Sequence, residues 1–392
     1  MKNKILYRFY IIALGFLSLQ SCVDPYHLET ENFEEVLVVE GTITNELKQQ
    51  KIKVSKSYRL EASGPQKVSD ANVFVTDSDG TQYEFDFTSS DSTYVSDVNF
   101  AAQPGKTYTL NITSGGKSYT SSPETLTTIN ELQEITTTVV TKNTGERGIK
   151  IGANSFDPAR NSNYYRYEYE ETFKVVAPYF STFDLKYDDS LMVFYLTDRI
   201  GGAQICYPTE KSNSIILTNT SNLSEDRVND FEVNFIKERD YKLAHRYSIL
   251  VKQYVQNLAA HTFYNTLKEL SEAGGVLSQN QPGFFYGNLK STTSPGEKII
   301  GFFEVSSVSQ KRIFINYSDY FTGSPNPYIT ECELKPYDIS DPDFGLEPFL
   351  AILGAGEVKY YSQSPPIYNM VSRVCADCSL ISTNTTIPPF WE

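Results

Sequence analysis

The residue whose chemistry the sequence specifies most clearly is Cys22. The run Leu19-Gln20-Ser21-Cys22 has the pattern of a lipobox, in which a branched apolar residue and two small or polar residues precede a cysteine. In such a segment the thiol takes a diacylglyceryl group, and cleavage before the cysteine leaves it as the acylated N-terminus. We therefore predict that Cys22 is lipidated.

The residues before Cys22 support this prediction. Lys2, Lys4 and Arg8 form a positive region, and residues 9–17 form an apolar core of nine residues. A membrane span needs about 20 residues, so this core is typical of a secretory signal. We expect residues 1–21 to be a lipoprotein signal peptide. The alternative is an ordinary signal peptide with an incidental cysteine.

Four further cysteines could pair, bind metal or act in redox chemistry. They are Cys206, Cys332, Cys375 and Cys378, and an even count in an exported chain suggests two disulfides of open connectivity. Cys375 and Cys378 have the spacing of a redox pair or half a zinc site, but their flanks are loop-rich. Cys206 and Cys332 are 126 positions apart and supply no second close pair. We expect structural disulfides, no metal and no cofactor.

Carboxylates are too common for neighbouring pairs to identify an active site. Asp188-Asp189 and Asp341-Pro-Asp343 could serve as the paired acids of a glycosidase, but 48 of the 392 residues are acidic. Thr76-Asp77-Ser78-Asp79-Gly80 partly matches a calcium loop without its terminal glutamate, and a hairpin turn is the simpler interpretation. These patterns predict no catalytic centre.

The histidines form no catalytic set. His27 lies near the N-terminus, His245 is isolated, and His261 is expected on the polar side of a helix. No nucleophile elbow, metalloprotease helix or phosphate loop is present. We expect the protein not to be an enzyme.

Two aromatic clusters are candidates for binding a ligand or a partner. Tyr165, Tyr167 and Tyr169 share one face of a predicted strand, and Phe284-Phe285-Tyr286 follows a predicted helix. Exposed aromatic rows can stack on sugar rings or dock proteins. The alternative is a ladder that faces the core, because strands are rich in tyrosine.

The elements that position these residues are predicted to be mainly β. Tyr and Phe number 28 and 24, and with many Thr, Ser and Val they favour strands. Residues 36–124 are expected to form an immunoglobulin-like or fibronectin-like β-sandwich, in which the Tyr108 hydroxyl caps a corner. Its predicted strands are 36–44, 51–58, 72–78, 81–87, 93–96, 107–114 and 117–121.

A larger β-rich domain is expected over residues 131–392, with one inserted helix at 257–273. Asn257 is its expected N-cap, and the expected apolar stripe is Ala259, Phe263, Leu267 and Leu270. After residue 317 we expect mostly irregular structure. The predicted strands are 134–141, 148–153, 164–176, 191–197, 214–218, 231–237, 247–255, 298–305 and 312–317.

Charge limits the partners that the chain can bind. The formal net charge is −14, and loss of the signal's three cations would bring it to about −17. Such a chain is not expected to bind nucleic acid or anionic headgroups through its charge. Residues 22–35 are predicted to be an acidic tether. An acidic run after a lipidated cysteine resembles signals for the outer face of the outer membrane, although any solvated linker has this composition.

Several motifs in combination resemble a known family. They are Val38-Val39-Glu40-Gly41, Tyr247-Ser-Ile-Leu-Val-Lys-Gln-Tyr254, Gln281-Pro-Gly-Phe-Phe-Tyr-Gly-Asn288, Gly301-Phe-Phe-Glu-Val, Lys311-Arg-Ile-Phe-Ile315, Cys375-Ala-Asp-Cys378 and Pro389-Phe-Trp391. With the lipobox, they resemble an uncharacterised family of Bacteroidota lipoproteins. Genes of this family commonly lie beside those of TonB-dependent outer-membrane receptors. The resemblance implies no catalytic residues.

We therefore expect a lipid-anchored outer-membrane protein on the cell surface. Its leading predicted function is that of an accessory binding protein for a TonB-dependent receptor in nutrient uptake. A surface adhesion or assembly protein is the alternative, and a surface hydrolase is a weaker one. The sequence does not identify a small-molecule, glycan or peptide ligand.

Overall fold

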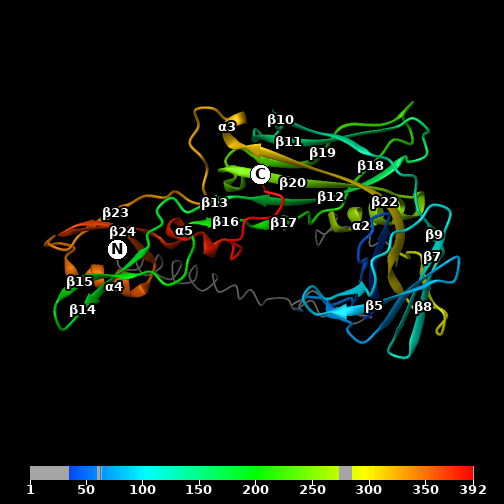
Figure 1. Ribbon diagram of the computed structural model, residues 1–392, viewed down its shortest axis with the longest axis horizontal. Coiled ribbons are helices and arrows are strands. Elements are labelled where there is room, and N and C mark those ends of the chain that lie inside the picture. The colour runs from blue at the N-terminus through cyan, green and yellow to red at the C-terminus, as the bar shows by residue number, and fades with distance from the viewer. Residues whose placement is uncertain (1–34, 60–61, 63, 273–284, 392) are drawn as a thin grey trace, which may run out of the picture.

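The computed structural model describes residues 35–59, 62, 64–272 and 285–391, and they are mainly β-strand (Figure 1). The prediction of a mainly β fold is thus confirmed. The three largest hydrophobic cores among the described residues belong to an N-terminal unit, a central unit and a smaller unit, which lies at the left-hand end of Figure 1.

The N-terminal unit contains every strand that we predicted between residues 36 and 121. In its corner the Gln103 amide donates to the Tyr108 hydroxyl over 2.9 Å, which confirms the predicted cap. The strands are β1 (Leu37–Thr44), β2 (Lys51–Lys56), β3 (Gln66–Lys67), β4 (Asn72–Asp77), β5 (Gln82–Thr88), β6 (Thr93–Ser96), β7 (Thr107–Ser114), β8 (Lys117–Ser121) and β9 (Glu124–Thr125).

Strands from the second half of the chain complete this N-terminal unit. β21 (Leu289–Ser291) pairs with β8, and the first half of β22 (Ile299–Asn316) pairs in parallel with β1. Leu289, Ile299 and Phe303 are buried in the N-terminal core. Residues 36–124 therefore do not build this core alone.

β22 connects the N-terminal and central units. Its residues up to Ser306 pair with β1, and those from Ser307 onward pair with β20 (Arg246–Val255). We predicted two strands here, 298–305 and 312–317, and the residues between them are mostly polar. The structure has one strand of 18 residues. A continuous sheet consequently runs through both units.

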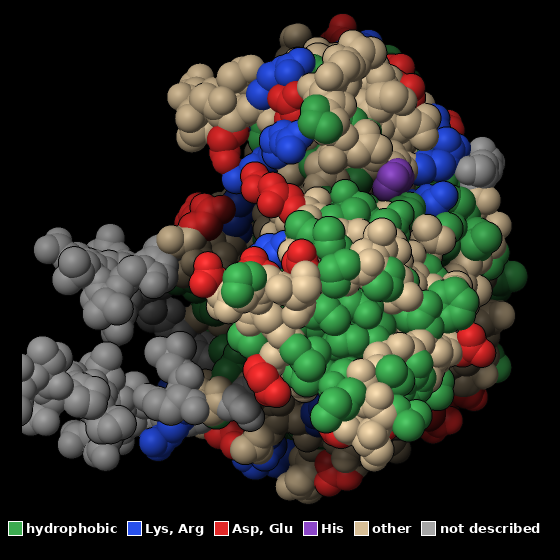
Figure 2. Space-filling model, turned by 90° about the vertical axis from the view of Figure 1, so that its left-hand side faces the viewer, with side chains coloured by type: hydrophobic (Ala, Val, Ile, Leu, Met, Phe, Trp, Pro, Cys, Tyr) green, Lys and Arg blue, Asp and Glu red, His purple; other side chains and the backbone are tan. Residues whose placement is uncertain are grey.

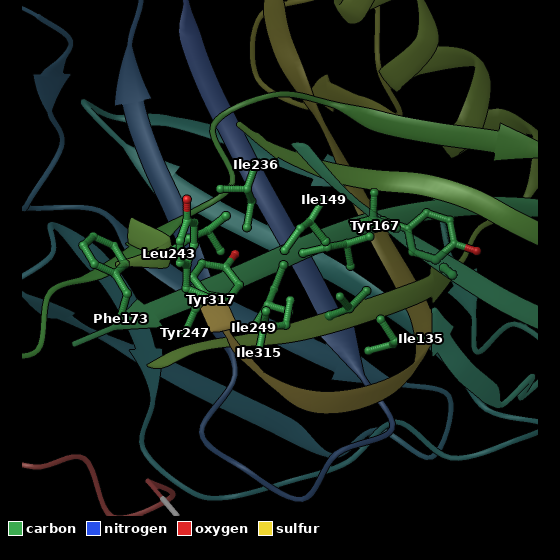
Figure 3. Packing of buried hydrophobic residues seen from close by; sticks show 14 of the residues in the cluster. Ile135, Ile149, Tyr167, Phe173, Ile236, Leu243, Tyr247, Ile249, Ile315 and Tyr317 are labelled. Carbon is green, nitrogen blue, oxygen red and sulfur yellow. The ribbon is translucent and has the colours of Figure 1, made fainter. Parts of the chain in front are cut away.

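The central unit has two β layers (Figure 1). One layer is β10 (Leu132–Thr141), β11 (Arg147–Asp157) and β19 (Asp226–Lys237), and the other contains β12 (Tyr164–Phe173), β20 and β22. Figure 3 shows Ile149, Ile236 and Ile249 meeting in the core between them. Short elements border the layers: β13 (Val175–Val176), β16 (Ile205–Cys206), β17 (Thr209–Lys211), β18 (Ile216–Asn219), η1 (Tyr241–Leu243), α3 (Tyr317–Tyr320), α5 (Arg373–Ala376) and η2 (Cys378–Leu380).

The predicted helix is α2 (Leu258–Glu272), and it contacts β12 and β22. The Asn257 side chain accepts from the Ala260 amide over 2.8 Å, which confirms the N-cap. The predicted stripe is wrong at Ala259, which is exposed, whereas Ala260 is buried. His261 is also buried, against our expectation. The buried face of α2 is rotated from the predicted stripe because Ala260 and Phe263 pack against Phe302 of β22.

Most of the third unit lies after residue 317, where we expected irregular structure, and the predicted strand 191–197 falls in its hairpin. It combines the hairpin β14 (Phe183–Asp188) and β15 (Val193–Asp198) with β23 (Lys335–Asp338), α4 (Leu346–Ala355), β24 (Val358–Ser364) and β25 (Ile367–Ser372). We call residues 183–198 and 335–372 the head. Its core contains Leu185, Phe349 and Met370, so two distant chain segments build it together. This long-range packing explains why local sequence patterns missed it.

Two glycines provide a test of the parallel pairing between β1 and β22, which connects the N-terminal and central units. Gly301 has a φ of +145°, and a Cβ there would overlap the Val39 carbonyl oxygen, whereas a Cβ at Gly41 would lie 3.3 Å from a Phe303 ring carbon. We expect Gly301→Ala to lower the free energy of unfolding by at least about 3 kcal/mol.

Gly41→Ala is the matched control, because it adds a methyl group to the same ladder without strained backbone. We expect it to cost at most about 1 kcal/mol in denaturant unfolding of the purified protein. Equal costs for the two variants would contradict the close approach at Gly301.

Candidate functional site

The tyrosine row on β12 lies largely inside the protein. Tyr165 and Tyr167 are buried, and Tyr169 is half-buried. The Tyr165 hydroxyl donates to Asp226 over 2.7 Å, and that of Tyr167 donates to Gln253 over 2.9 Å. The proposed ligand-binding row is therefore wrong for Tyr165 and Tyr167, which face the core because a second β layer covers this side of β12.

The second aromatic cluster is only partly described. Phe284 lies outside the described residues, as do Cys22 and His27. Phe285 packs on Phe263 of α2 with ring centroids 5.4 Å apart, and Tyr286 is exposed. Of this cluster, Tyr286 is the side chain that the structure presents to solvent.

The acidic pairs accept hydrogen bonds from backbone amides of the turns in which they lie. Asp188 accepts from the amides of Ser190 and Leu191, and Asp341 accepts from the amide of Asp343. Asp77 likewise accepts from the amides of Asp79 and Thr81, which is the hairpin-turn interpretation of the calcium-like motif. Within the described residues, no cluster of three or more His, Cys, Asp or Glu side chains could hold a metal.

The four described cysteines form two disulfides. Cys206 pairs with Cys378, and Cys332 pairs with Cys375, with Cα atoms 5.8 and 5.7 Å apart. The two cysteines of the Cys-x-x-Cys motif therefore bond to different partners and not to each other. This arrangement confirms the structural interpretation, and it settles the connectivity that the sequence left open.

A buried charge network that the sequence analysis missed lies where the two larger units meet. The Arg166 guanidinium on β12 is 2.6 Å from the carboxylate of Glu304 on β22. Glu304 also accepts from Thr42 of β1 over 2.9 Å and from Gln256 over 2.8 Å. Because both ions are buried, each depends on the other for compensation of its lost hydration.

Aromatic rings enclose the same guanidinium. Arg166 lies 4.3 Å from the Tyr254 ring centroid and 5.0 Å from that of Tyr264 on α2. It also pairs with Glu168. The network thus fixes α2 and the four strands β1, β12, β20 and β22 to one another, and its groups bond mainly to each other. We assign it a structural role.

The base of the head is fixed by covalent and polar bonds. We call residues 199–206, 328–334 and 373–378 the neck. Both disulfides lie there, and Arg199 donates to the Ala376 carbonyl and to the Asp377 carboxylate, each over 3.0 Å. The Cys378 amide donates to Ala203 over 2.9 Å. These bonds restrict motion of the head relative to the central unit.

Asp377 is the acceptor at the centre of the neck. Its carboxylate receives the amides of Ala203 and Ser379, both over 2.9 Å, in addition to Arg199. Burial alone would raise the pKa of this carboxyl, but the hydrogen bonds from Ser379 and Ala203 and the charge of Arg199 outweigh it. The pKa of Asp377 therefore lies below its ordinary value.

The outer side of the head is an exposed apolar surface. Leu191 and Met192, at the tip of the β14–β15 hairpin, are 70% and 78% exposed. Figure 2 views this end of the molecule and shows a broad hydrophobic area across it. We call this surface the apolar face. On β15, Val193 and Tyr195 alternate with Phe194, which packs against the head core, and together with Leu191 and Met192 they are the exposed side chains that define the face.

Helix α4 of the head is apolar on nearly all sides, a sequence pattern from which we made no prediction. Helix α4 has the sequence Leu-Glu-Pro-Phe-Leu-Ala-Ile-Leu-Gly-Ala, with Glu347 as its one charged residue, yet Phe349 is its one buried residue. A helix that is apolar on all sides normally lies inside a protein or against a partner. Among the described residues, no helix combines the length and apolar character needed to cross a bilayer.

These observations define a mainly β protein in which three cores are connected and a fixed head exposes an apolar face. Residues 23–312 match the model of a family described as a domain of unknown function (DUF4249), and the chain belongs to that family. This agrees with the resemblance to an uncharacterised family at that coarser level. No curated protein matches the chain.

The neck carboxylate gives a pH-dependent prediction. Because the folded-state pKa of Asp377 is lowered, its stabilising effect is present above the unfolded pKa, about 4, and is lost as the pH falls through the folded pKa. We expect Asp377→Asn to lower the free energy of unfolding at pH 7 by about 1–3 kcal/mol. The difference from wild type should shrink below about pH 5.

The measurement is denaturant unfolding at several pH values, with hydrogen exchange of the neck amides as a local readout. Asp198→Asn, at an exposed carboxylate of the same head, is the control and should change little. A wild-type advantage over Asp377→Asn that grows towards low pH would contradict the assignment.

Proposed function

We propose that the protein is a lipid-anchored accessory protein of the outer membrane that binds a TonB-dependent receptor, without catalytic activity of its own. The observation that carries the binding role is the exposed apolar face on a head held by two disulfides. Exposed apolar surfaces of this kind commonly mark interaction sites. The choice of a receptor as partner rests on the family resemblance of the motifs.

The proposed attachment to the membrane rests on Cys22. The chain has a formal net charge of −14, so anionic headgroups would repel it and a lipid would have to supply the attachment. Residues 23–35 could reach at most about 45 Å when fully extended. Such a tether would leave the folded units free to approach a partner in the same membrane.

Adhesion or assembly at the cell surface is the second candidate function. The apolar face would serve either role, because burial of apolar surface does not by itself select the type of partner. Co-purification distinguishes them. After mild detergent extraction of native membranes, a TonB-dependent receptor identified by mass spectrometry supports the proposal, and a clean monomer counts against it.

The lipid anchor is tested separately. We expect Cys22→Ala to move the folded protein from the membrane fraction to the soluble fraction, because the acceptor thiol is lost. Ser21→Ala keeps a small residue in the lipobox and is the matched control, which should stay in the membrane fraction. Membrane association of Cys22→Ala at the wild-type level would overturn the anchor.

A further inference from the structure

The apolar face lacks a covering element among the described residues. Its tip side chains Leu191 and Met192 are largely exposed, and Val193 and Tyr195 of β15 are exposed beside them. Burial of such side chains contributes roughly 25 cal/mol per Å² of apolar surface. A contiguous apolar area of this breadth is typical of an interaction surface rather than of ordinary solvent-facing structure (Figure 2).

The head is strongly acidic. It carries nine acidic and three basic side chains, for a formal net charge of −6. Lys359 is paired with Asp184 over 3.1 Å, whereas Asp189 and Glu347 are exposed. Figure 2 shows side chains of both signs around the hydrophobic area. The apolar face therefore belongs to a head whose net charge is negative.

This charge distribution distinguishes between occupants. Anionic headgroups would repel the acidic head, which disfavours a bilayer. Two copies facing each other through this surface would bring two heads of net charge −6 together, which disfavours self-association. A protein surface with an apolar centre and lysine or arginine around it is complementary in both respects.

The neck makes the face suitable for tight binding. Cys206–Cys378 and Cys332–Cys375 lie at its base, and Arg199 bonds to Ala376 and Asp377 beside them. Since the head is already fixed, little conformational entropy is lost when a partner covers it. The cysteines thus have a role beyond the stability of a loop-rich tail: they present the apolar face in one orientation.

We infer that the apolar face of the head is the surface that docks on the TonB-dependent receptor, at a site with an apolar centre bordered by basic side chains. This inference rests on the proposed function. Hydrophobic contacts from Leu191 and Met192 supply most of the affinity, and the acidic side chains of the head accelerate association and set the orientation.

The test uses the full-length lipidated protein and the purified receptor in detergent. Leu191→Ser/Met192→Ser removes two tip anchors from a turn where the fold does not bury them. Leu47→Ser/Leu258→Ser is the matched control, because these leucines are 76% and 59% exposed on other units. Circular dichroism and denaturant unfolding establish that both double variants fold as the wild type does.

We expect the head variant to weaken receptor binding at least about tenfold, since a central anchor contributes more than about 1.4 kcal/mol. The control variant should bind as the wild type does. Asp188→Asn/Asp189→Asn should slow association and reduce its dependence on salt, with a smaller change in dissociation.

The outcomes separate the inference from the proposed function. If wild type and head variant bind the receptor equally, the docking surface is wrong and the proposed function stands. If none of the variants nor the wild type binds a receptor, both fail. Binding to anionic or zwitterionic vesicles, or a dimer in sedimentation, that is lost in the head variant and accompanied by unchanged receptor binding would assign the face to a bilayer or to a second copy and overturn the inference.

Discussion

The parallel pairing of β1 with β22 is the constraint on which the rest of the structure depends. It joins Val39 to Gly301 across most of the chain and makes one strand serve two cores. Closing such a long loop costs conformational entropy, and burial of apolar side chains must offset that cost. Phe303 and Val305 on one side of the junction and Ile315 further along supply that burial. Gly301 allows the close backbone approach.

The charged groups at the same junction add specificity. Arg166 on β12 and Gln256, which follows β20, both bond to the Glu304 carboxylate on β22 inside the protein. A buried ion pair contributes little net stability compared with apolar packing, but removal of one partner leaves an uncompensated charge. The network therefore favours one position of β22 relative to β12, which lies beyond β20 in the same sheet. This places the second half of β22 correctly for the central core.

The head is held by a different kind of interaction. It is small, and its core depends on residues from two distant segments, such as Leu185 and Phe349. Small apolar cores are only marginally stable, and disulfides commonly compensate for this in exported proteins. The two disulfides and the Arg199–Asp377 pair at the neck supply that stabilisation. The exposed apolar side chains at the tip of the head are thus separate from the cores that stabilise the fold.

The sequence by itself determined the features that depend on near neighbours. Period-two alternation and turn residues gave the strands of the N-terminal unit, the Tyr108 corner and the Asn257 cap, because each involves residues only a few positions apart. Only the tertiary structure decided what covers each face. The alternation predicted that Tyr165 and Tyr167 share one face of a strand, but it did not decide whether that face is buried. It also could not predict the disulfide between Cys206 and Cys378 or the packing of α4 beside the β14–β15 hairpin. These outcomes depend on contacts between distant residues, which the local period of a sequence does not encode.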